Sequence, residues 1–114
     1  MAIRYHITLP NPDTARGSDP AFAFRAHGAA ALAAELQDAL RTDTLFKRWV
    51  GAQEDPDDVD PELGAKDPVA TVEGSQHDLH IDLIAVTSIP GGVLRHRLRL
   101  LAGNGWEWRD VSAA

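Results

Sequence analysis

The chain of 114 residues contains no cysteine. Disulfide bonds, thiolate metal ligands and cysteine nucleophiles are therefore excluded. No stretch approaches the roughly 20 apolar residues that a membrane-spanning helix needs, and the N-terminal residues lack the apolar segment of a secretory signal. We therefore expect a protein of the cytoplasm that makes no contact with a membrane.

Positive charge is also scarce. Lys and Arg number 11 against 17 Asp and Glu, which gives a formal net charge of −6. Because phosphates attract Lys and Arg, this balance opposes non-specific binding to nucleic acid. The sequence has no G-x-S-x-G, no P-loop and no G-x-G-x-x-G motif. We expect no cofactor, and the lack of these catalytic motifs weighs against an enzyme.

What the sequence does contain is typical of a globular protein. The hydrophobic content is 44% and the charged content 25%, and this length fits one α+β domain, placed over residues 1–114. Residues 53–68 differ from the rest, because they are rich in Asp, Glu and Pro and poor in apolar side chains. This composition predicts a mobile acidic loop.

Residues Gly28–Arg41 give the clearest helix signal. Leu32, Leu36 and Leu40 recur every four residues, and the far side carries polar residues. Alanine, the best helix former, fills many of the remaining positions. Propensity and pattern therefore predict the same amphipathic helix.

Two shorter segments flank this helix. Residues 44–50 predict a second short helix that stops at Gly51. Residues 21–26 are ambiguous, because the alternating phenylalanines suit a strand, whereas Asp19-Pro20 suits the start of a helix. We favour the strand.

The other apolar residues alternate with polar ones, which is the period of a β-strand. The alternation predicts strands over residues 3–9, 69–73, 79–86, 94–100 and 106–111, with turns at Gly74-Ser75, Pro90-Gly91-Gly92 and Gly103-Asn104-Gly105. We therefore predict an α+β fold in which an antiparallel β-meander carries the helix Gly28–Arg41 on one face.

In this meander, the strand 79–86 pairs with the strand 94–100. Ile81 then faces Leu100 on the apolar side, and Asp82 faces Arg99 on the other. The predicted core consists of Leu32, Leu36, Leu40, Leu45, Trp49, Leu79, Ile81, Leu83, Leu98 and Leu100. The order of a helix followed by several strands also resembles that of small Sm-like barrels. Such a barrel with a preceding helix is the alternative architecture.

The segment His77-Asp78-Leu79-His80-Ile81-Asp82 is the first candidate site. On a strand, Asp78, His80 and Asp82 project from one face at steps of about 6.6 Å. Carboxylate and imidazole are common ligands of Zn²⁺ and similar ions. These three residues form a candidate metal site, and a metal-assisted hydrolase is the enzymatic alternative. The simpler explanation is that Asp82 pairs with Arg99 across the ladder.

Arg95, Arg97 and Arg99 form the second candidate, on one side of a predicted strand. A two-residue turn at Asn104-Gly105 places Trp108 beside them, and a three-residue turn places it in the core. Arginines interleaved with aromatic rings are typical of surfaces that bind single-stranded nucleic acid. Weak binding of single-stranded RNA is therefore a further alternative, although the net charge opposes it.

Ile84, Val86 and Leu101 remain among charged residues on the outer face of the predicted sheet. A half-apolar surface of this kind often meets a partner. Since no catalytic set is visible, we expect a small non-enzymatic binding or assembly module that self-associates or binds a protein partner.

Overall fold

The strand predicted first, Ile3–Leu9, forms β1. It lies inside an open sheet with the strand order β2-β3-β1-β4, where β2 is Thr71–His77, β3 is His80–Thr87 and β4 is Glu107–Ala113. All neighbouring strands are antiparallel. This description comes from a computed structural model that describes residues 2–114. Because the sheet is open, the Sm-like barrel alternative is wrong.

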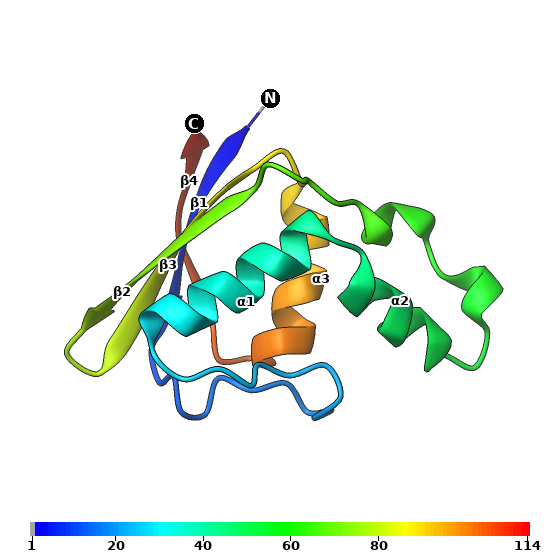
Figure 1. The fold of residues 1–114 in the computed structure, drawn as a ribbon, viewed down its shortest axis with the longest axis horizontal. Helices are drawn as coiled ribbons and strands as arrows, with labels where there is room; N and C mark the ends of the chain where they lie inside the picture. Colours follow the sequence, from blue (N-terminus) through cyan, green and yellow to red (C-terminus); the bar gives the residue numbers. More distant parts are fainter. Residues whose placement is uncertain (1) are drawn as a thin grey trace.

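Within residues 2–114, three α-helices complete the α+β fold: α1 is Ala29–Arg41, α2 is Thr44–Gly51 and α3 is Gly91–Ala102. Figure 1 shows α1 and α3 on one side of the sheet and α2 farther from it. The order β1-α1-β2-β3-α3-β4, with α2 inserted, is the split βαβ, or ferredoxin-like, topology. That topology describes connectivity and carries no function by itself.

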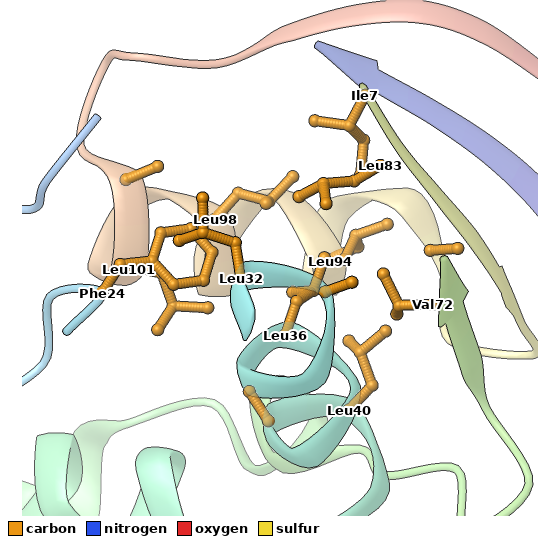
Figure 2. Close-up of a cluster of buried hydrophobic side chains, with 14 of the residues drawn as sticks. Ile7, Phe24, Leu32, Leu36, Leu40, Val72, Leu83, Leu94, Leu98 and Leu101 are labelled. Carbon is orange, nitrogen blue, oxygen red and sulfur yellow. The ribbon is translucent and has the colours of Figure 1, made fainter. Parts of the chain in front are cut away.

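The core lies between the sheet and these helices. Figure 2 shows Ile7, Leu83 and Val72 of the strands meeting leucines of α1 and α3. Leu32, Leu36 and Leu40, the stripe that predicted α1, are all buried. The helix predicted on one face of the sheet is therefore confirmed. Of the predicted core, Trp49 and Leu100 are only partly buried, and Leu79 is 86% exposed.

The strand predicted over residues 94–100 is wrong, because these residues lie in α3. The pairing of Ile81 with Leu100 is wrong for the same reason, and β3 pairs with β1 and β2 instead. The leucines at 94 and 98 fit both a period of two and a period of four. After Val93 the segment has no β-branched residue, and Arg and Leu favour helix. Gly103, at a φ of 62°, ends the helix.

Two further segments differ from the prediction. Residues 21–26 form no strand, yet Phe22 and Phe24 are buried, and the Phe24 amide donates to the Leu101 oxygen at 2.8 Å. The turn expected at Gly74-Ser75 lies instead at Asp78-Leu79, which explains the exposure of Leu79.

Residues 53–68 contain two short 3-10 turns, η1 at Pro56–Asp58 and η2 at Pro61–Gly64. Most of these residues are exposed. The buried guanidinium of Arg97 holds the end of the segment by donating to the main-chain oxygens of Leu63 and Ala65. The mobility expected of this acidic segment stays a prediction.

None of the helices described within residues 2–114 has the length and apolar character that crossing a bilayer requires.

Candidate functional site on the outer sheet face

The two faces of the sheet differ in how deeply their side chains are buried. Along β3, the residues Ile81, Leu83 and Ala85 point to the helices and are buried. His80, Asp82, Ile84 and Val86 alternate with them and are only partly buried. Since the helices lie on one side of the sheet (Figure 1), these residues belong to the opposite side.

We name this opposite side the outer sheet face. The strand registers and side-chain contacts assign to it Arg4, His6, Thr8, Thr71, Glu73, Ser75, His77, His80, Asp82, Ile84, Val86, Glu107, Arg109, Asp110 and Ser112.

The carboxylate of Asp82 lies at the centre of three imidazoles. The Nε2 atom of His6 is 3.4 Å from its Oδ1 atom. The Nε2 atoms of His77 and His80 are each 3.5 Å from its Oδ2 atom. These side chains come from β1, β2 and β3, so the pairing of three strands assembles the cluster. We call these four residues the histidine cluster.

Two further side chains hold the carboxylate of Asp82 in place. The Thr8 hydroxyl donates to Asp82 Oδ1 at 2.6 Å, and Arg109 Nε donates to the Thr8 hydroxyl oxygen at 3.1 Å. Burial disfavours the charged form of Asp82, but the Thr8 hydroxyl and the charges of His6 and His80 outweigh it and lower its pKa. Asp82 is therefore an ionised, oriented carboxylate.

The imidazoles themselves are held less firmly. The rings of His77 and His80 are stacked with centroids 5.5 Å apart, and Ser75 Oγ lies 3.0 Å from His77 Nε2. His77 and His80 side chains are 55% and 40% exposed. The Nε2 atom of His6 is buried and, among the described residues, has no hydrogen-bond partner.

The cluster differs from the site predicted from sequence. His80 and Asp82 do share the outer sheet face, but Asp78 lies in the turn that precedes β3, at a φ of 53°. His6 and His77 join the cluster; His77 belongs to the segment that the sequence singles out, but neither residue is among the predicted ligands. In their present side-chain conformations, no three His, Asp or Glu side chains within residues 2–114 form a group that could hold a metal ion. The predicted hydrolase stays a prediction.

The surface predicted for Arg95, Arg97 and Arg99 does not form, because a helix distributes these side chains around its axis. Arg97 is 1% exposed, and only the other two reach solvent. Trp108 lies on the helix-facing side, with its ring centroid 5.4 Å from that of Tyr5. The guanidinium carbon of Arg95 is 6.0 Å from the centre of the Trp108 ring.

The half-apolar surface predicted for self-association forms with two of its three predicted residues. Ile84 and Val86 are on the outer sheet face as expected. Leu101 is not, because it lies in α3 and is buried against the core.

Comparison of the chain with protein-family models, curated proteins and solved structures gives no significant match.

Proposed function

We propose that the protein is a small non-enzymatic assembly module of the cytoplasm that self-associates through the outer sheet face. One observation supports the proposal: helices lie on one side of the sheet (Figure 1), while Ile84 and Val86 of the inner strand β3 are only partly buried on the other. Packing against a second sheet is a common way to bury such a surface.

Both edge strands of the outer sheet face carry charged residues that a second copy would meet. Glu73 lies on the edge strand β2, and Arg109 lies on the opposite edge strand β4. A two-fold axis parallel to the strands would place β2 of one copy over β4 of the other. Glu73 of each copy would then approach Arg109 and Asp110 of its partner, because Glu73 and Asp110 lie in the same cross-strand row.

The size of the face sets the expected strength of the dimer. Four strands of about seven residues cover about 19 by 23 Å. Two such faces bury about 900 Å² together, which is below the range of stable specific interfaces and in that of weak, transient ones. The dimer should therefore be reversible and dependent on concentration.

Sedimentation velocity over a concentration series tests the proposal with wild type, Ile84→Lys and Val69→Lys. Ile84→Lys introduces a charge at the centre of the outer sheet face. Val69→Lys makes the same kind of change at a residue that is 79% exposed and lies outside this face. Wild type and Val69→Lys should dimerise alike, and Ile84→Lys should remain monomeric. A strictly monomeric wild type, or equal loss in both variants, would contradict the proposal.

A further inference from the structure

The three distances between an imidazole nitrogen and an Asp82 oxygen are close to those between neighbouring ligands of a tetrahedral metal ion. Zn–N bonds of about 2.0–2.1 Å separate neighbouring ligand atoms by about 3.3 Å. The three imidazole Nε2 atoms lie 3.4, 3.5 and 3.5 Å from oxygen atoms of Asp82. Each imidazole thus already has the spacing from the carboxylate that two ligands of one ion require.

The chemistry of the cluster also suits a metal ion. Three imidazoles and one carboxylate are donors that Zn²⁺, Ni²⁺ and Cu²⁺ accept. The buried Nε2 atom of His6 makes no hydrogen bond of good geometry among the described residues, and Asp82 Oδ1 at 3.4 Å is the acidic atom that it faces. The hydrogen bonds from Arg109 to Thr8 and from Thr8 to Asp82 resemble the outer-shell contacts that orient metal ligands.

Side-chain rotation must complete the site, since the present conformations do not form one. The three imidazoles are the groups able to rotate, because the side chains of His6, His77 and His80 are 36%, 55% and 40% exposed, against 16% for Asp82. Staggered rotamers of exposed side chains interconvert readily. Small rotations of these rings are the change that the site needs, since each Nε2 atom already lies within 3.5 Å of the Asp82 carboxylate.

We propose that His6, His77, His80 and Asp82 bind one divalent transition-metal ion of the Zn²⁺ type on the outer sheet face. This inference goes beyond the proposed self-association and does not depend on it. Zn²⁺ binding by wild type at dilutions at which it is monomeric would separate the two ideas.

Isothermal titration of tag-free, EDTA-treated protein with Zn²⁺ near neutral pH tests the site. Wild type should bind one ion per chain. His77→Ala and His80→Ala should each weaken binding more than about tenfold. His27→Ala is the matched control, because His27 lies outside the cluster, with Nδ1 3.3 Å from Arg16. Thermal unfolding in EDTA would establish that each variant is folded.

A spectroscopic readout identifies the ligands directly. The imidazole nitrogen resonances of His6, His77 and His80 should shift on addition of Zn²⁺, and those of His27 and His96 should not. Absence of binding by wild type would overturn the proposal and leave the cluster as a set of histidine–carboxylate contacts. Equal weakening by His27→Ala would overturn it as well.

Discussion

Arg97 in α3 donates a hydrogen bond of 3.2 Å from Nη1 to the main-chain oxygen of Ala39 in α1. Its Nη2 atom donates to the oxygens of Leu63 and Ala65. Burial lowers the pKa of Arg97, and the charge of Asp43 partly opposes this shift. One guanidinium therefore connects two helices with the end of the acidic segment.

Replacing Arg97 by Met should lower the free energy of unfolding by about 2–4 kcal/mol, because three carbonyl oxygens lose their donor. Arg99→Met is the control, since Arg99 lies two residues away in α3 and is exposed. Its effect should stay within about 0.5 kcal/mol. Urea denaturation measures both values, and similar effects of the two substitutions would show that Arg97 does not hold these elements together.

Asp67 should make the protein sensitive to acid. It is 6% exposed and accepts hydrogen bonds from the Thr87 hydroxyl at 2.9 Å and from the Ser88 amide at 3.0 Å. The Ser88 amide bond outweighs burial, so the pKa of Asp67 lies below its ordinary value of 3.8. A lowered folded-state pKa gives stability that is present above that ordinary value and is lost as the pH falls through the folded-state pKa.

The stability difference between wild type and Asp67→Asn should therefore be largest near neutral pH and should narrow below pH 3.8. Urea denaturation at several pH values measures this. Asp57→Asn changes an exposed carboxylate of the acidic segment and should show no such dependence. A difference for Asp67→Asn that is constant with pH would refute the assignment.

Gly74 allows α1 to approach β2 closely. A methyl group at this position would collide with the main-chain oxygen of Ala29, the first residue of α1. Gly74→Ala should therefore destabilise the protein by about 1–3 kcal/mol. Gly92→Ala, in α3, meets no atom within 4 Å and should be neutral or stabilising. Thermal melting distinguishes the two, and a neutral Gly74→Ala would mean that the helix and strand lie farther apart.

The elements predicted correctly are those whose hydrophobic pattern fits only one period, that of a strand or that of a helix. β1 alternates strictly, and the leucines of α1 repeat every four residues, so both elements were found. The segment that became α3 fits two periods, and choosing the shorter one created a false strand. That error also placed Arg97, one of the most buried residues, on an exposed surface.

The candidate site was only half predictable for a related reason. His80 and Asp82 are two residues apart on one strand, so their common face follows from the period alone. His6 joins them through the register of β1 on β3, in which His6 lies opposite Ile84 and Thr8 opposite Asp82. His77 joins through the position of the β2–β3 turn. Neither long-range pairing nor an exact turn position is fixed by local composition.

The most direct test of the proposed self-association is a dilution series followed by amide nuclear magnetic resonance. If the outer sheet face is the interface, dilution should shift the amide signals of β1 and β3, most of all around Ile84 and Val86. The signals of α1 and α3 should stay constant. Shifts centred on the helices, or no shifts over a range that reaches high concentration, would contradict the account.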